Sequence, residues 1–303
     1  MRIAIIGYGE MANKYKKVIE YLDYYVCCFM KKNKLEPEHL KSIIPVVYDC
    51  HALLEYNPDA VIIAVSQENT LNVLQELLSI KFLPILVEKP VLFESKDINK
   101  IWNNNNIKVA YNRRFYKGIV ELNAKLKKGD NKLKSVYINL PEPIDEYKKI
   151  GVKLLEEYPL HYSASHVIDL LFYLLGDIQI QDMYRNKDCY VGLLMAKEIN
   201  NMPILFKSVF NAFEHTEMTF NFENEVWTFC PIEELRIYGK LVKNNNSYYQ
   251  NMVDEIIEDK TFKPGLIEEV RRFLYFNKED NLATLDDAYK VSNLCNQITG
   301  RVE

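Results

Sequence analysis

The sequence contains no apolar run close to the roughly 20 residues that a membrane-spanning helix needs. It also lacks an excess of basic residues, because its 38 Lys and Arg are outnumbered by 42 Asp and Glu, for a formal net charge of −4. Binding to a nucleic-acid backbone requires a basic surface, since the phosphates are negatively charged. We therefore expect neither a membrane protein nor a nucleic-acid-binding protein.

Patterns typical of disulfide-rich and metal-binding proteins are missing as well. The six cysteines form no C-x-x-C motif, and no His-x-x-His motif accompanies them. We therefore expect free thiols in a reducing cytoplasm and no bound metal. A first strand that begins at Arg2 leaves no room for a signal peptide, which agrees with a cytoplasmic location.

The first third of the chain alternates between strand-like and helix-like segments. Strands are expected at 3–6, 25–30, 43–47, 60–65, 84–87 and 108–111, and helices at 11–22, 52–55 and 70–78. The strands read as continuous apolar runs, which is typical of strands buried on both faces. This alternation predicts an α/β fold, with a doubly wound parallel sheet of the Rossmann type over residues 1–115.

The pattern changes after residue 115, where strands follow one another with few helices between them. Strands are expected at 134–140, 177–184, 189–195, 204–210, 217–222 and 226–229, and helices at 116–128, 163–175, 265–276 and 285–298. Such an order predicts a second, α+β domain over residues 116–303 with a mainly antiparallel sheet. The charged segment 141–158 is read as a substrate lid or as a solvated connection.

The amino-terminal strand runs directly into a glycine turn and a helix. Gly7 permits a tight turn, Gly9 lets the backbone approach a phosphate, and the small Ala12 lets helix and strand pack closely. We therefore predict a dinucleotide-binding turn, although an ordinary glycine turn has the same spacing. The predicted cofactor-binding residues here are Gly7, Tyr8, Gly9, Glu10, Met11 and Ala12.

The end of the second strand bears on the choice between NAD and NADP. An acidic residue at this position binds the ribose 2′-hydroxyl of NAD, but the chain has Lys31 and Lys32 instead. Two lysines suit a 2′-phosphate, so we favour NADP(H) over NAD(H). Two solvated surface lysines are the alternative.

Two further segments carry side chains suited to proton transfer. Lys89 follows a buried strand in Glu88-Lys89-Pro90, and the proline forces extended geometry on it. Such a lysine can lose some of its proton affinity near an oxidised nicotinamide ring. In the second segment Tyr162, His166 and Asp169 share one face if the segment is helical. Asp169 there either orients the imidazole or makes a structural hydrogen bond.

These segments, in this order, resemble the glucose–fructose oxidoreductase, inositol dehydrogenase and rhizopine-catabolism (Gfo/Idh/MocA) family. The likeness extends over nearly the whole chain. The matching motifs are Gly7-Tyr8-Gly9-Glu10-Met11-Ala12, Asp59-Ala60-Val61-Ile62-Ile63-Ala64, Glu88-Lys89-Pro90, Tyr111-Asn112-Arg113-Arg114-Phe115, Ser165-His166-Val167-Ile168-Asp169-Leu170, Leu175-Gly176 and Ile267-Glu268-Glu269-Val270-Arg271-Arg272-Phe273.

The resemblance implies oxidation or reduction by NAD(P) at a hydroxyl-bearing carbon of a sugar, cyclitol or nucleotide sugar. It implies that Lys89 and His166 carry the proton transfer, with Tyr162 as a further candidate. Asn112, Arg113 and Asp169 are the expected substrate-binding residues, and Val65, Ser66 and Glu88 are taken as further cofactor contacts. It also implies an open carboxy-terminal sheet that forms a homodimer or homotetramer.

The chain departs from the family pattern at the catalytic helix. The family commonly has Asp-x-Gly-x-His-x-x-Asp, whereas Tyr162 and Ala164 occupy the first two positions here. The loop after the strand at 60–65, Ser66-Gln67-Glu68-Asn69-Thr70, also lacks the usual Pro and His. Three alternatives therefore stand beside a dehydrogenase: a lyase or glycosidase that uses transient oxidation, a non-enzymatic sensor of sugar or redox state, and a biliverdin-reductase-like enzyme.

Overall fold

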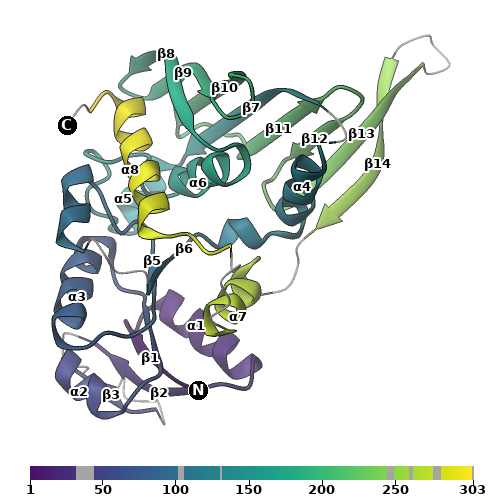
Figure 1. Cartoon of the computed structure of the whole chain (residues 1–303). Coiled ribbons are helices and arrows are strands. Elements are labelled where there is room, and N and C mark those ends of the chain that lie inside the picture. Colours follow the sequence, from purple (N-terminus) through teal and green to yellow (C-terminus); the bar gives the residue numbers. More distant parts are fainter. Residues whose placement is uncertain are drawn as a thin grey trace. The chain divides into compact units, whose positions relative to one another are not determined.

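The computed structural model of the protein describes residues 1–31, 44–101, 106–129, 132–243, 249–258, 262–275 and 281–301. The chain divides into two compact units (Figure 1). The first unit comprises Met1–Asn112 and Leu266–Ser292, and the second comprises Arg113–Gly265 and Asn293–Glu303. The stretch Leu266–Ser292 therefore belongs with the amino-terminal sheet, whereas the sequence pattern groups it with the carboxy-terminal domain.

The first unit contains a six-stranded sheet in which all neighbouring strands are parallel, with the order β3-β2-β1-β4-β5-β6. This order is the one that dinucleotide-binding Rossmann folds use. The strands are β1 (Arg2–Ile6), β2 (Tyr25–Met30), β3 (Val46–Val47), β4 (Ala60–Ile63), β5 (Ile85–Glu88) and β6 (Ile107–Ala110). The helices are α1 (Glu10–Tyr21), α2 (Cys50–Glu55), α3 (Gln67–Ile80), α7 (Leu266–Tyr275) and the start of α8 (Leu285–Thr299). The predicted parallel sheet is confirmed.

Helix α1 shows how this sequence builds the first unit. Ala12, Tyr15, Val18 and Ile19 are fully buried and recur at helical spacing. Their stripe packs on β1 and β2, and α1 also contacts α7 from the far end of the chain. Further along the chain Ala283 lies beside the sheet, where its carbonyl accepts a backbone hydrogen bond of 2.8 Å from Val109. These contacts hold Leu266–Ser292 in the first unit.

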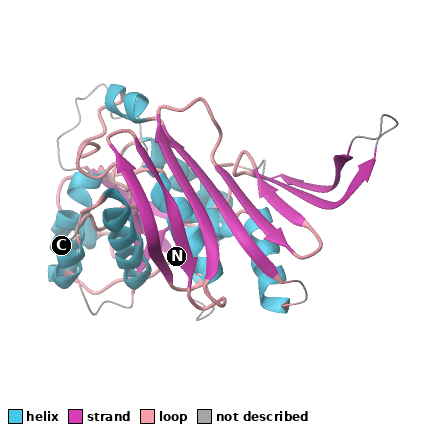
Figure 2. Cartoon of the chain, turned by 90° about the horizontal axis from the view of Figure 1, so that it is seen from above, coloured by secondary structure: helices cyan, strands magenta, loops and turns pink. Residues whose placement is uncertain are grey.

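The second unit is an eight-stranded sheet with the order β14-β13-β12-β11-β7-β10-β9-β8 (Figure 2). All its pairs are antiparallel except β7 with β10, so the expected mainly antiparallel sheet is confirmed. The strands are β7 (Leu133–Glu142), β8 (Ile178–Asn186), β9 (Cys189–Ala196), β10 (Met202–Phe210), β11 (Glu217–Phe222), β12 (Val226–Phe229), β13 (Glu234–Lys243) and β14 (Tyr249–Glu258). Its helices are α4 (Lys117–Lys128), α5 (Ile144–Lys149), α6 (Ala164–Leu175) and the end of α8.

Three elements of the second unit were not predicted. The hairpin of β13 and β14 was missed, because the register of the pair shifts between Tyr238 and Leu241, around Gly239, and the apolar alternation is interrupted there. Figure 1 shows this hairpin reaching beyond the other strands. Helix α5 lies within the charged segment that was read as a lid or a solvated connection. The asparagine-rich runs 103–106 and 244–246 predict turns, and except for Asn106 they lie outside the described residues.

The two faces of the large sheet differ in what covers them. Helix α4 approaches one face closely at Gly118, where a Cβ atom would lie only 2.8 Å from the ring of Phe229. The opposite face carries the alternate residues of each strand, among them Val191 and Leu205, which are exposed.

All six cysteines are free thiols, and Cys27, Cys28, Cys50 and Cys295 are buried. Over the described ranges, no helix is both long enough and apolar enough to cross a membrane.

Candidate functional site

The predicted cofactor residues gather at one edge of the parallel sheet. The glycine turn follows β1, Lys31 follows β2, and Val65 and Ser66 follow β4. Lys89 follows β5, and Asn112 comes shortly after β6. Because the strands are parallel, all these residues lie at the carboxyl edge of the sheet, where folds of this class bind ligands. Lys32 lies outside the described residues.

The glycine turn has the geometry that a dinucleotide pyrophosphate requires. Gly7 has φ +127°, its amide donates to the carbonyl of Met30 over 2.8 Å, and a Cβ on it would lie 2.1 Å from the carbonyl oxygen of Ala64. Gly9 precedes α1, and a Cβ on it would meet no atom within 4 Å. The space beside Gly9 therefore lets another group come close to the backbone, and the helix amino terminus that follows suits an anion. The residues of this turn fit a bound dinucleotide.

Side chains around the turn are held by the sheet and by α1. The ring of Tyr8 meets that of Phe29 edge to face at 5.2 Å, and Ala12 is fully buried against the strands. The exposed carboxylate of Glu10 pairs with Lys14 one helical turn later, at 2.6 Å. The backbone amide of Lys31 donates to the carbonyl of Val47 over 2.9 Å, which fixes the end of β2 next to β3.

The segment Glu88-Lys89-Pro90 is anchored from α1. The hydroxyl of Tyr15 donates a hydrogen bond of 2.7 Å to Oε1 of Glu88, and Tyr15 is fully buried. Burial raises the pKa of Tyr15 well above its ordinary value, and the carboxylates of Glu88 and of Glu269 in α7 raise it further. The peptide bond between Lys89 and Pro90 is cis. Sequence reasoning identified Glu88 and Lys89 but missed Tyr15, because its partner lies far away in the chain.

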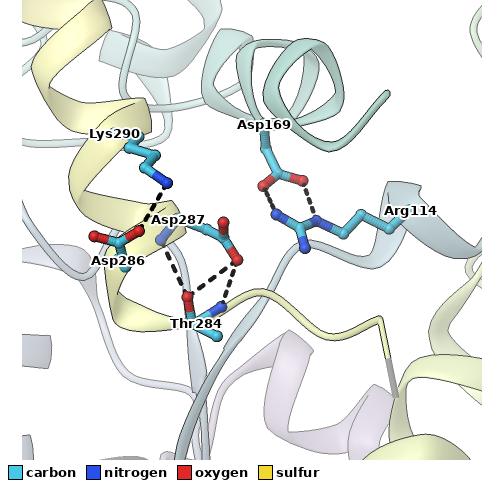
Figure 3. A network of polar contacts seen from close by, with 6 residues as sticks. All are labelled: Arg114, Asp169, Thr284, Asp286, Asp287 and Lys290. Atoms are coloured by element: carbon cyan, nitrogen blue, oxygen red, sulfur yellow. Dashed lines mark hydrogen bonds and ion pairs between the residues drawn. The ribbon is translucent and has the colours of Figure 1, made fainter. Parts of the chain in front are cut away.

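In the second unit, helix α6 is anchored by a buried ion pair (Figure 3). Nε of Arg114 donates to one carboxylate oxygen of Asp169 over 2.8 Å, and Nη2 donates to the other over 2.5 Å. The Arg114 side chain is 4% exposed and that of Asp169 is 0% exposed. The guanidinium of Arg114 also lies 4.8 Å from the ring centre of Tyr173. The sequence left two roles for Asp169, orientation of the imidazole or a structural hydrogen bond. This ion pair is a contact of the structural kind.

Tyr162 does not lie on the helix that carries His166 and Asp169, so the shared helical face expected for all three is wrong for Tyr162. Helix α6 begins at Ala164, with Ser163 as its N-cap residue, and Tyr162 precedes both. His166 and Asp169 are separated by one helical turn and are both buried. The amide of His166 donates to the carbonyl of Ser163 over 3.1 Å.

A tyrosine that sequence reasoning overlooked packs against Tyr162. The rings of Tyr147 and Tyr162 have centres 4.3 Å apart and meet edge to face. Burial and the carboxylate of Glu142 raise the pKa of Tyr147, whereas its hydrogen bond with Ser163 and the charge of Arg113 act in the opposite direction. The arrangement joins α5, the end of β7 and the start of α6. Only the spacing of Ile144 and Tyr147 hinted at a helix here.

The part of the chain that the structure describes contains no evident set of side chains for binding a metal ion. Among those residues, no group of three or more His, Cys, Asp or Glu side chains is arranged to hold a metal ion.

Comparison with known families agrees with this geometry. Residues 1–108 match the Gfo/Idh/MocA family model, described as an oxidoreductase family with an NAD-binding Rossmann fold. The match confirms the family resemblance for residues 1–108, which contain the parallel sheet. No curated protein sequence matches the chain significantly.

Solved structures share the fold over almost the full length of the chain. UDP-N-acetylglucosamine 3-dehydrogenase from Acidithiobacillus ferrooxidans has a TM-score of 0.75 at 14% identity, covering 100% of this chain and 97% of that one. Levoglucosan dehydrogenase, in complex with NADH and levoglucosan, has a TM-score of 0.75 at 12% identity, covering 99% and 96%. A super-repressor mutant of Gal80p from Saccharomyces cerevisiae has a TM-score of 0.75 at 13% identity, covering 99% and 95%. At these identities the likeness establishes the fold.

Proposed function

We propose that the protein is an NAD(P)-dependent oxidoreductase that acts at a hydroxyl-bearing carbon of a sugar, cyclitol or nucleotide sugar. The observation that supports this most is the common edge of the sheet on which a dinucleotide-fitting glycine turn and Lys89 both lie. UDP-N-acetylglucosamine 3-dehydrogenase and levoglucosan dehydrogenase, both named for sugar substrates, share the fold. A bound nicotinamide supplies the group that donates or accepts the hydride.

Residues of the chain bind the cofactor and the substrate and transfer the proton. Gly7, Gly9 and the first amides of α1 bind the pyrophosphate. Lys89 hydrogen-bonds the reacting oxygen, and His166 or Tyr162 exchanges the proton with it. Asn112 and Arg113 bind the substrate, and Asp169, the third expected substrate-binding residue, is held by its buried ion pair with Arg114. Binding in a fixed orientation supplies much of the rate in such reactions.

The test combines binding with turnover. Purified protein is titrated with NADPH and with NADH, and its thermal unfolding is recorded, since a ligand at about one hundred times its dissociation constant adds about 2.7 kcal/mol to stability. A panel of sugars, cyclitols and nucleotide sugars is then assayed by the absorbance of the reduced nicotinamide. The expected result is turnover in the wild type and its loss in Lys89→Met with cofactor binding retained. Unchanged turnover in Lys89→Met would remove the catalytic role of this lysine.

We further propose NADP(H) as the preferred cofactor. Lys31 follows the strand whose end distinguishes the two cofactors, and neither Met30 nor Lys31 is acidic. A lysine there suits the 2′-phosphate of NADP.

A second candidate function is a non-enzymatic regulator that binds the cofactor or a sugar. Tyr162 occupies the position at which the family commonly has an aspartate, and a repressor shares the fold at a TM-score of 0.75. This candidate predicts a thermal shift with cofactor but no turnover on any member of the substrate panel.

We also propose that the large sheet associates with a second copy of the chain. Its open face carries the exposed apolar side chains of Tyr184, Val191 and Leu205, which neighbour one another across β8, β9 and β10. Exposed apolar side chains that gather on one sheet face are typical of an association surface.

A further inference from the structure

The end of β5 is held by a hydrogen bond that none of the assigned roles uses. Tyr15 is the one polar member of the buried stripe of α1, and its hydroxyl donates to Oε1 of Glu88 over 2.7 Å. A buried phenol needs such a partner, because an unsatisfied hydroxyl in an apolar interior costs free energy. Glu88 is the last residue of β5 and directly precedes Lys89.

The bond joins two elements of the first unit, and a third acts on it. Tyr15 belongs to α1 and Glu88 to β5, and the negative charge of the Glu269 carboxylate in α7 raises the pKa of the Tyr15 hydroxyl further. Glu269 is fully buried. Both carboxylates and burial favour the protonated phenol, so Tyr15 stays a hydrogen-bond donor across the ordinary pH range.

We propose that Tyr15 is a positioning residue for Lys89. Its hydroxyl holds the Glu88 carboxylate, and this bond fixes the backbone at the end of β5 from which Lys89 projects. The catalytic importance of the Lys89 position rests on the proposed function. The position of Lys89 itself can be measured without a substrate. Rigid supporting contacts matter because a small misplacement of a reacting group costs up to about 100-fold in rate.

The experiment observes Lys89 directly in the full-length protein. Lysines are reductively methylated with ¹³C-formaldehyde, and the Lys89 signal is assigned by its disappearance in Lys89→Arg. Its chemical shift and its titration with pH are then compared in wild type, Tyr15→Phe and Tyr25→Phe. Tyr25 is the matched control, because it is an exposed tyrosine of the same unit. We expect Tyr15→Phe to shift the signal and its titration midpoint, and Tyr25→Phe to leave both unchanged.

A second pair of variants keeps the test decisive if Tyr15→Phe does not fold. Glu88→Gln and Glu88→Leu both remove the charge, but only the glutamine keeps an oxygen that accepts from Tyr15. The Lys89 signal should lie nearer to its wild-type position in Glu88→Gln than in Glu88→Leu. An identical Lys89 signal in wild type and Tyr15→Phe, or in the two Glu88 variants, would overturn the positioning role.

Turnover separates this inference from the proposed function. With a substrate in hand, Tyr15→Phe should lower kcat by about 10- to 100-fold with a changed pH profile, while KM and cofactor affinity stay close to wild type. A loss of affinity and stability without a change in the pH profile would indicate a merely structural tyrosine. If Lys89→Met retains turnover, the catalytic assignment fails, while the signal shift in Tyr15→Phe still reports on position.

Discussion

The guanidinium of Arg114 binds both carboxylate oxygens of Asp169 in the interior of the second unit (Figure 3). Arg114 directly follows Arg113, which is proposed to bind substrate, and Asp169 lies one turn beyond His166 on α6. The pair therefore ties the chain next to one proposed site residue to the helix that carries another. Tyr173 and Asn123 extend the contact towards α4, because the amide of Asn123 donates to the Tyr173 hydroxyl over 2.7 Å.

Removing one partner of this buried ion pair should strongly lower the stability of the folded protein. Asp169→Ala leaves the buried charge of Arg114 without its carboxylate, which typically costs about 3–5 kcal/mol. Urea unfolding of the variant measures the loss. Asp286→Ala is the matched control, because Asp286 pairs with Lys290 at 2.8 Å on an exposed surface, where such pairs contribute less than about 1 kcal/mol. Similar losses in both variants would contradict the anchoring role of Asp169.

The two glycines of the cofactor turn should respond differently to alanine. In Gly7→Ala the new Cβ collides with the carbonyl of Ala64 at a φ of +127°, so the folded state should lose about 1–3 kcal/mol or more. In Gly9→Ala the Cβ meets open space, so stability should change by at most about 1 kcal/mol. The thermal shift on adding NADPH should nevertheless fall in Gly9→Ala, because the Cβ stands where backbone approaches phosphate. An undiminished shift would argue against this turn as the pyrophosphate site.

Cofactor preference should reverse when the lysines after β2 become acidic. The double variant Lys31→Asp, Lys32→Asp replaces partners of a 2′-phosphate with groups that repel it, so the dissociation constant for NADPH should rise at least about tenfold. NADH should bind as well as before or better. Lys81→Asp, at the exposed carboxyl end of α3, controls for the change in net charge that each single substitution brings. Fluorescence titration measures both cofactors, and a retained preference for NADPH would refute the assignment.

Charges on the open face of the large sheet should separate an oligomer into smaller species. Leu205→Glu and Val191→Glu alter neighbouring strands of this face, because Leu205 pairs with Leu193 and Lys207 pairs with Val191 across β9 and β10. Light scattering after gel filtration should give a lower mass for these variants than for wild type. Ile150→Glu introduces the same charge at an exposed apolar residue outside the sheet and should leave the mass unchanged. A monomeric wild type would exclude the proposed association.

The sequence predicted the strands that are almost entirely buried. Strand β4 is buried throughout, β1 and β2 are buried after their first residues, and the expected ranges of all three differ from the observed ones by two residues at most. The hairpin of β13 and β14 was missed because the shift around Gly239 breaks the alternation on which a strand is recognised. A local sequence pattern cannot reveal such a pairing, because contacts with the partner strand stabilise the strand.

The sequence predicted those parts of the candidate site that are continuous motifs. It did not predict the contacts between residues that are far apart in the chain. The glycine turn and Glu88-Lys89-Pro90 are continuous motifs, and the fold brings both to the carboxyl edge of the sheet. The partners of these motifs were not predictable, because Tyr15 and Glu88 are 73 positions apart and Arg114 and Asp169 are 55 positions apart. A side chain can be named from sequence, but its hydrogen-bond partner follows only from tertiary packing.

The return of α7 to the first unit has a consequence for how the protein is made. The nucleotide-binding sheet and the helix that packs on α1 are separated in the chain by most of the second unit. During translation, the surface of α1 that α7 covers stays uncovered until that entire unit has been synthesised. The first unit therefore begins to leave the ribosome first, but its fold can be completed only after α7 has been synthesised. A fragment that ends at Asn112 should expose apolar surface and aggregate.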